Sequence, residues 1–146
     1  MANQKFDEQE FVTESADETE ILGADFAAAL REPVCVILSG GLGAGKTHFT
    51  RGIVSVFGTQ EEVASPTFTL VHEYKTRPPI VHLDFYRLKN EADAWSVGLE
   101  DILADRVICI VEWGEKFAEL LPQRRWSVQF ESIGDTSRKI KFHYAK

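Results

Sequence analysis

The sequence is poor in cysteine and has no long apolar run. Its two cysteines, Cys35 and Cys109, stand inside apolar, strand-like stretches, and neither a disulfide framework nor a metal-binding spacing is visible. No apolar run approaches the ~18 residues of a membrane-spanning helix, and no charged-then-apolar signal opens the chain. We therefore expect a soluble, cytoplasmic protein whose cysteines pack as small hydrophobic residues.

An excess of basic residues is also missing. The formal net charge is −7 and the pI is about 5.1, whereas a general nucleic-acid-binding surface needs a basic face. Any connection to RNA is therefore expected to be indirect. The chain of 146 residues has no repeat or linker and is too short for a nucleotide domain plus a separate substrate domain. Residues 1–146 are predicted to form one domain.

What the sequence does contain is a phosphate-binding loop. Residues 40–47 read Gly-Gly-Leu-Gly-Ala-Gly-Lys-Thr and match G-x-x-x-x-G-K-[ST] at every fixed position. A β-branched, apolar stretch at 34–38 precedes the loop, and a predicted helix at 46–57, closed by Gly58, follows it. Glycines let backbone N–H groups wrap a triphosphate, and the helix N-terminus adds donors and positive potential.

The loop predicts roles for individual side chains. Lys46 is expected to reach the β- and γ-phosphates as a catalytic residue, and the Thr47 hydroxyl is expected to bind Mg²⁺. The alternative is a plain glycine-rich turn between a strand and a helix. The residues predicted to bind the nucleotide are Gly41, Leu42, Gly43, Ala44, Gly45, Lys46, Thr47 and His48.

Two further apolar runs each end in an acid. The run at 80–83 leads into Asp84, and the run at 107–111 leads into Glu112. In a parallel nucleotide-binding sheet such strand ends meet at the ligand edge. We expect Asp84 to bind the metal, directly or through water, and Glu112 to position or activate the attacking water, so that Thr47, Asp84 and Glu112 surround Mg²⁺. Two strand-terminal charges in solvent are the alternative.

A polar segment between these elements is a candidate nucleotide switch. Ser65, Pro66 and Thr67 open the segment, and in switch loops a hydroxyl can meet the γ-phosphate or Mg²⁺ and order the loop. By pattern alone, a polar loop entering a strand is the competing interpretation. Trp113 directly follows Glu112 and is either a core residue or a contact for a partner or the nucleotide.

The flanking segments predict further elements. Residues 10–14 form a candidate strand, and Ser15 opens a helix that Pro33 stops. A strand is expected at 70–75, and short helical pieces at 90–97, 99–104 and 114–121.

At the C-terminal end, apolar and polar residues alternate over 126–131 and 139–144, which predicts an antiparallel hairpin with one buried face. Its other face is basic, and it is either a solvated strand face or a surface for an acidic partner or RNA. The four histidines show no ligand spacing and are expected to be structural.

Four segments, in this order and spacing, resemble the bacterial TsaE (YjeE) family. They are residues 42–47 (L-G-A-G-K-T), 65–70 (S-P-T-F-T-L), 82–87 (H-L-D-F-Y-R) and 111–113 (V-E-W). Two positions depart from the family pattern: Gly41 stands where an acid is usual, and His48 stands where a second threonine is common. Neither change removes a group assigned to phosphate or metal.

The resemblance implies an α/β fold, a P-loop NTPase-like three-layer sandwich with a mixed sheet. It also implies an ATPase that serves the TsaB–TsaD complex in making the threonylcarbamoyl modification on the adenosine beside the anticodon of tRNA. ATP turnover would be weak without these partners, and tRNA would be met only through the complex. Carried over residue by residue, Lys46 and Thr47 hold phosphate and Mg²⁺, Thr67 belongs to a switch, and Glu112 and Trp113 belong to the catalytic end.

Two other functions fit the same phosphate loop. One is a small-molecule kinase, although the chain has no spare domain or arginine-rich lid to enclose an acceptor. The other is a non-catalytic module in which nucleotide binding governs assembly, since no arginine finger is obvious. Arg51 and Arg87 are the arginines best placed to supply transition-state charge, and surface or structural roles are the alternative for both.

Overall fold

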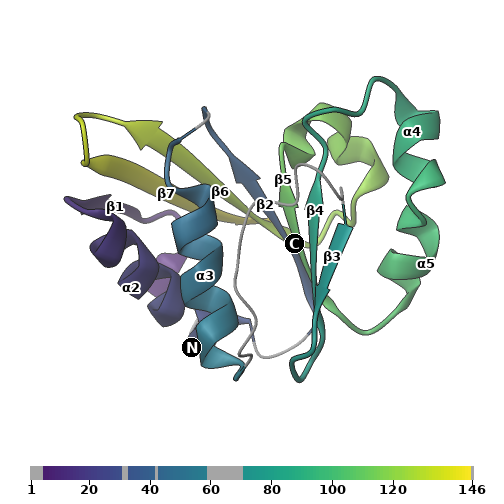
Figure 1. Ribbon diagram of the computed structural model, residues 1–146, viewed down its shortest axis with the longest axis horizontal. Coiled ribbons are helices and arrows are strands. Elements are labelled where there is room, and N and C mark those ends of the chain that lie inside the picture. Colours follow the sequence, from purple (N-terminus) through teal and green to yellow (C-terminus); the bar gives the residue numbers. More distant parts are fainter. Residues whose placement is uncertain (1–4, 31–32, 42, 59–70, 146) are drawn as a thin grey trace.

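The computed structural model describes residues 5–30, 33–41, 43–58 and 71–145, which build one seven-stranded mixed sheet (Figure 1). The three central pairs, β2 with β5, β2 with β6 and β4 with β5, are parallel, and the outer pairs are antiparallel. In order across the sheet the strands are β1 (Glu10–Thr13), β7 (Arg138–Ala145), β6 (Arg125–Ser132), β2 (Val34–Ser39), β5 (Ile108–Glu112), β4 (Ile80–Asp84) and β3 (Val71–Tyr74).

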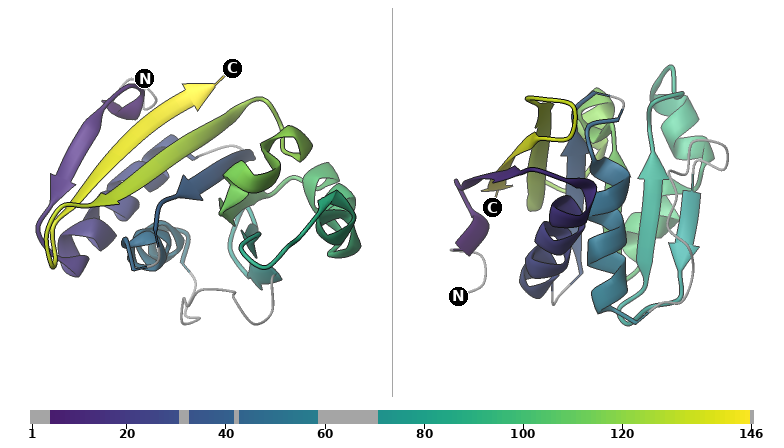
Figure 2. Two further views of the ribbon diagram at one scale, coloured as in Figure 1. Left: turned by 90° about the horizontal axis from the view of Figure 1, so that it is seen from above. Right: turned by 60° about the vertical axis from the view of Figure 1, so that its left-hand side comes forward.

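Helices cover both faces of the sheet, which gives the predicted three layers (Figure 2). α2 (Ala16–Phe26) and α3 (Lys46–Val56) cover one face. α4 (Glu91–Ser96), α5 (Leu99–Ala104) and the 3₁₀ helix η2 (Gly114–Leu120) lie on the other side. Side chains of β2 alternate between the two cores, as period-two geometry requires. The predicted α/β class and mixed sheet are therefore confirmed.

The pair α2 and α3 packs unusually closely because a glycine stands at each crossing point. A Cβ atom built on Gly23 would lie 2.1 Å from the carbonyl oxygen of Phe49, and one built on Gly52 would lie 1.9 Å from that of Glu20. Glycine normally destabilises a helix interior by about 0.5–1 kcal/mol relative to alanine. Here it allows backbone to meet backbone, so these glycines fix the distance between the two helices.

The N-terminal strand and cap follow the prediction, whereas the end of the first helix does not. Ser15 Oγ accepts a hydrogen bond from the Glu18 amide at 3.1 Å, and Glu18 reaches back to the Glu14 amide at 3.2 Å. The α-helix ends at Phe26, and a 3₁₀ turn, η1 (Ala27–Ala29), follows it. A tighter 3₁₀ last turn supplies hydrogen bonds to carbonyl groups that the end of an α-helix leaves without a donor. The helical piece predicted at 114–121 is likewise 3₁₀.

The C-terminal hairpin is confirmed, and its edge is covered. β6 and β7 pair antiparallel, with Trp126, Phe130 and Phe142 buried against α2 and α3. β1 then adds to the outer edge of β7. On the solvent face Glu10 lies 3.6 Å from Lys139 and 3.8 Å from Lys141, so an acid of β1 offsets part of the hairpin's basic charge. Within the described ranges, no helix is long and apolar enough to cross a membrane.

Candidate functional site

The phosphate loop joins the central strand β2 to α3, and its glycines are required by its shape. Gly40 has φ +138°, and a Cβ atom there would lie 2.5 Å from the carbonyl oxygen of Phe130 on β6. Gly45, the N-cap of α3, has φ +101°, where side chains are rarely tolerated. Gly41 differs, because a Cβ atom there meets nothing within 4 Å. The loop therefore has room for a side chain at this position.

Lys46 is the first residue of α3, and its side chain is buried at the mouth of the loop. Its Nζ donates a hydrogen bond to the Gly40 carbonyl oxygen at 2.9 Å and lies 4.3 Å from the centre of the Trp113 ring. Burial lowers the pKa of Lys46 below its usual value, while the nearby carboxylates of Glu112, Glu115 and Asp84 oppose that shift. The ammonium group therefore lies in a largely desolvated environment near three carboxylates.

Asp84 and Glu112 lie opposite each other at the carboxyl ends of β4 and β5. The two residues are register partners in a parallel pair, and only 3% and 4% of their surfaces are exposed. Their strands explain the shared direction: Asp84 follows Ile80 and His82 on the face that carries α3, and Glu112 follows Ile108 and Ile110. The predicted meeting of the two acids at one edge of the sheet is present.

Each acid is held by a different partner. The Asp84 carboxylate accepts a hydrogen bond from the backbone amide of Tyr86 at 2.8 Å. The Glu112 carboxylate contacts the imidazole of His82, with Oε2 and Nε2 only 2.7 Å apart. His82 is fully buried, and its Nδ1 is the one buried side-chain nitrogen or oxygen without a hydrogen-bond partner among the described residues.

Lys46, Asp84 and Glu112 line a single pocket of about 460 Å³, a size within the usual range for small-molecule sites. Most of the predicted nucleotide-binding and metal-binding residues line it, together with Trp113. Gly41 is absent from the lining, and Leu42, Ser65, Pro66 and Thr67 lie outside the described residues. The lining residues are Gly43, Ala44, Gly45, Lys46, Thr47, His48, Asp84, Tyr86, Glu112 and Trp113.

Sequence reasoning missed three contributors to this region. Tyr86 packs against Trp113 at the pocket wall, with the rings tilted and their centroids 5.0 Å apart. Arg138 of β7 donates from Nη2 to the Gly43 carbonyl oxygen at 3.0 Å and so ties the hairpin to the phosphate loop. The third is His82, which stands two residues before Asp84, so strand alternation places both side chains on one face. This spacing was one available signal, and the other was that His82 and Tyr86 both lie in the segment at 82–87 that carries the family resemblance.

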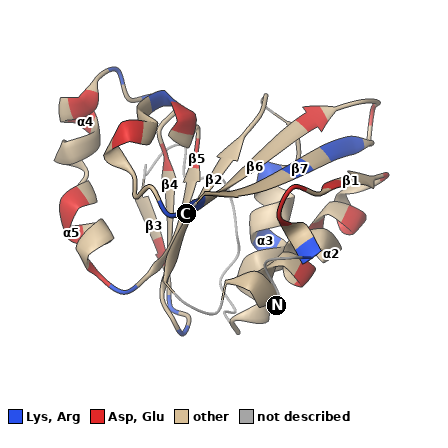
Figure 3. Ribbon diagram, turned by 180° about the vertical axis from the view of Figure 1, so that it is seen from behind, with Lys and Arg blue, Asp and Glu red and all other residues tan. Residues whose placement is uncertain are grey.

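The donor set suits a hard divalent cation. Two buried carboxylates and the Thr47 hydroxyl border the phosphate loop, and oxygen donors of this kind are what Mg²⁺ prefers. Lys46 supplies one positive charge against Asp84 and Glu112, so the pocket keeps an excess of negative charge. Acidic side chains also mark α2, α4 and α5, whereas basic ones gather on β7 (Figure 3).

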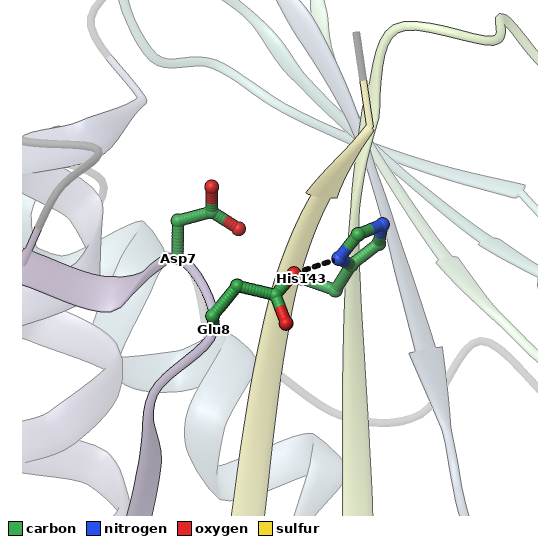
Figure 4. A group of neighbouring side chains, drawn as sticks. All are labelled: Asp7, Glu8 and His143. Atoms are coloured by element: carbon green, nitrogen blue, oxygen red, sulfur yellow. Dashed lines mark hydrogen bonds and ion pairs between the residues drawn. The ribbon is translucent and has the colours of Figure 1, made fainter.

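A second group of side chains that can bind a metal lies near the carboxyl end of β7, the end away from Arg138 (Figure 4). Atoms of Asp7, Glu8 and His143 that can bind a metal lie within 4.8 Å of one another. Glu8 pairs with His143, and Asp7 accepts a hydrogen bond from the Tyr144 amide at 2.8 Å. Glu8 and His143 are exposed, so this group is a surface tie between the segment before β1 and the last strand. Sequence spacing gave no sign of it.

A glycine loop between a central strand and a helix, with acids ending the neighbouring parallel strands, defines a P-loop NTPase-like protein. The family model described as "Threonylcarbamoyl adenosine biosynthesis protein TsaE" matches residues 13–140. The chain therefore belongs to the TsaE family.

Individual relatives agree with this assignment. The tRNA threonylcarbamoyladenosine biosynthesis protein TsaE of Treponema pallidum is 36% identical over 88% of this chain and 96% of its own length. The TsaE protein of Bacillus subtilis is 38% identical over 89% of this chain and 82% of its own. The crystal structure of B. subtilis YdiB superposes with a TM-score of 0.76 at 32% identity and covers 94% of this chain and 84% of that one.

Proposed function

We propose that this protein binds ATP with Mg²⁺, hydrolyses it slowly alone, and serves tRNA threonylcarbamoyladenosine biosynthesis through a complex with TsaB and TsaD. One observation carries the proposal: Lys46, Asp84 and Glu112 meet beside the phosphate loop in one pocket. The names of the relatives supply the pathway.

The proposed division of roles follows from what each side chain can reach. Backbone N–H groups of the loop and of the first turn of α3 hold the phosphates. Lys46 exchanges its bond to the Gly40 carbonyl oxygen for phosphate oxygens. Thr47 and Asp84 hold Mg²⁺, which when bound neutralises charge on the β- and γ-phosphates. Glu112, which also borders the metal, orients the attacking water.

In the reaction, a water oxygen forms a bond to the γ-phosphorus as the bond to the bridging oxygen of ADP breaks. The electron pair of that bond leaves with ADP, and the water proton passes to the released phosphate or to Glu112. Such a transition state is stabilised mainly by placement and by positive charge. One lysine and one divalent cation would supply little of that charge, so we expect slow turnover by the isolated protein.

The charge distribution supports an indirect link to tRNA. The net charge is −7, and acidic side chains mark three of the helices. A surface of this kind repels a polyanion, so the tRNA would be held by partner proteins. We place the contact with these partners near the pocket, where Tyr86 is exposed beside Trp113.

The test is phosphate release from ATP and from GTP, measured with and without purified TsaB and TsaD. We expect slow hydrolysis of ATP alone, faster hydrolysis with both partners, and a lower rate with GTP. Failure of the partners to raise turnover, together with unchanged tRNA modification in cells that lack this protein, would contradict the proposal.

The Glu112→Ala variant separates catalysis from a purely nucleotide-governed assembly role. We expect it to lose about 10²–10⁴-fold in turnover, the usual contribution of a positioned acid or base, while it still binds ATP. Glu115→Ala is the matched control, because Glu115 is an exposed acid that also acts on Lys46. An unchanged rate in Glu112→Ala would favour the non-catalytic module.

A further inference from the structure

We propose that His82 is a positioning residue for hydrolysis: its imidazole holds the Glu112 carboxylate in the orientation that the attacking water needs. This inference rests on the proposed function, because it assigns a residue that acts through Glu112. The observation that motivates it is the 2.7 Å contact between Nε2 of His82 and Oε2 of Glu112 inside the sheet.

The pairing of β4 with β5 brings the two side chains together. His82 stands in the middle of β4, where its register partner on β5 is Ile110, so Glu112 is its diagonal neighbour on the same face. The imidazole is fully buried, and 4% of Glu112 is exposed. A short bond in a dry place is strong and has few competing geometries. It occupies Oε2 and leaves Oε1 as the oxygen available to a water in the pocket.

The second ring nitrogen argues against a simple packing role. Nδ1 of His82 is buried with no hydrogen-bond partner in the described part of the chain, and such an orphaned polar atom is destabilising. The neighbouring positions Val81 and Leu83 fill the opposite face with apolar side chains. An apolar residue at 82 would avoid the orphaned nitrogen, so the imidazole is explained by its one bond to Glu112.

The same asymmetry assigns the donor. A carboxylate can only accept, so the Nε2–H group of the imidazole donates to Oε2 of Glu112. The Tyr74 ring lies 6.3 Å from the His82 ring, centroid to centroid, and itself packs at 4.3 Å against the ring of His72.

Asp84 provides the internal contrast. Its carboxylate is fixed by a backbone amide, that of Tyr86, which any residue at 86 except proline supplies. Glu112 has the longer side chain, with one more rotatable bond to restrain, and a side chain two strand positions away does so. Substitution of His82 is therefore expected to act on the orientation of Glu112.

Three substitutions at one position test the idea. The amide nitrogen of His82→Gln reaches about as far as Nε2, whereas that of His82→Asn reaches only as far as Nδ1, and His82→Phe keeps a ring without a donor. We expect His82→Asn and His82→Phe to lower kcat for ATP by about 10–100-fold, the usual loss when a supporting hydrogen bond is removed from a site residue. His82→Gln should retain most of the rate, and the KM for ATP should change by less than about twofold in all three.

A double-mutant cycle with Glu112→Ala gives the decisive readout. If His82 acts through Glu112, adding His82→Asn to Glu112→Ala should cause no further loss of kcat. His72→Asn is the control, since His72 is the register partner of His82 on β3 and its ring packs against Tyr74. It removes an imidazole from the same sheet and should leave kcat unchanged.

The outcomes separate the inference from the proposed function. Full activity in His82→Asn, an equal loss in His82→Gln and His82→Asn, or an additive loss in the cycle would overturn the role of His82. In each of those cases Glu112→Ala would still lose about 10²–10⁴-fold in turnover if the proposed function holds. An active Glu112→Ala would instead overturn the proposed function itself. If His82→Phe fails to fold, the comparison of His82→Gln with His82→Asn still decides.

Discussion

The two faces of strands β4 and β5 carry different kinds of side chain, although both faces belong to the same two strands. On the face toward α3, apolar side chains give way to His82, Asp84 and Glu112 as the strands approach their carboxyl ends. On the opposite face the side chains stay apolar, from Val81 through Leu83 and from Cys109 through Val111. One face carries the proposed chemistry, and the other anchors the strands that present it.

The comparison teaches that activity and stability are separable within a few residues of chain. Side chains at successive positions of a strand point to opposite faces, so a substitution at 83 and one at 84 meet different surroundings. We expect changes on the face toward α3 to act on turnover, and changes on the opposite face to act on the free energy of unfolding.

Among the tests of this comparison, the largest effect is expected at the phosphate loop. Lys46→Met removes the ammonium group that is proposed to bind the β- and γ-phosphates, and we expect turnover to fall by about 10²–10³-fold, as when one transition-state donor is lost. Stability should be kept or rise, because the variant no longer buries a charge whose pKa burial lowers. Phosphate release and urea unfolding of the same preparation measure both. A marked loss of stability would break the comparison.

Leu83→Ala should give the converse result. Leu83 is fully buried in the core under α5 and η2, and truncating such a leucine costs about 2–5 kcal/mol of unfolding free energy. Turnover per folded molecule, measured well below the unfolding transition, should stay within about threefold of the original. A loss of turnover equal to that of Glu112→Ala would show that the two faces are not independent.

Arg138 adds a third element to the comparison, because its side chain extends from the C-terminal hairpin to the phosphate loop. Arg138→Gln loses the donated bond to the Gly43 carbonyl oxygen, so the loop is held less firmly. We expect the KM for ATP to rise by about threefold to tenfold, which corresponds to one hydrogen bond of about 0.6–1.4 kcal/mol, with kcat little changed. Lys139→Gln, whose side chain lies 3.6 Å from Glu10, is the neighbouring control and should leave KM unaltered.

The smallest effect concerns the thiols of the apolar face. A hydrogen bond with Cys35, together with burial, raises the pKa of Cys109 well above its usual 9.0. The unfolded chain therefore releases this proton first as the pH rises, and stability should fall above about pH 9, by at most about 1.4 kcal/mol per pH unit. Urea unfolding of the protein and of Cys109→Ala at pH 8 and pH 10 checks this. An equal pH dependence in both proteins would refute the assignment to Cys109.

Local patterns sufficed to predict much of the fold. Apolar runs located the central strands and alternation located the C-terminal hairpin. The loop motif located the start of α3, and Ser15 located the start of α2. Each of these signals depends on residues within one turn or one strand. The meeting of Asp84 and Glu112 followed from one further rule, that parallel strands share a carboxyl edge. The sequence therefore contained the main elements of the candidate site.

Contacts between distant segments could not be predicted in this way. Arg138 and Gly43 lie 95 positions apart, and His82 and Glu112 lie 30 apart, so no local period joins them. They depend on the order of strands in the sheet, which places β7 and β4 where they are. The surface group of Asp7, Glu8 and His143 depends likewise on β1 joining β7.

The crossing of α2 and α3 has a consequence for how the protein tolerates change at its start. Because Gly23 and Gly52 each touch backbone, a bulkier residue at either point would have to push the helices apart. The displaced helix would carry Lys46 with it, since α3 begins at that residue. A substitution at Gly23, far from the pocket in sequence, would then weaken nucleotide binding as well as stability.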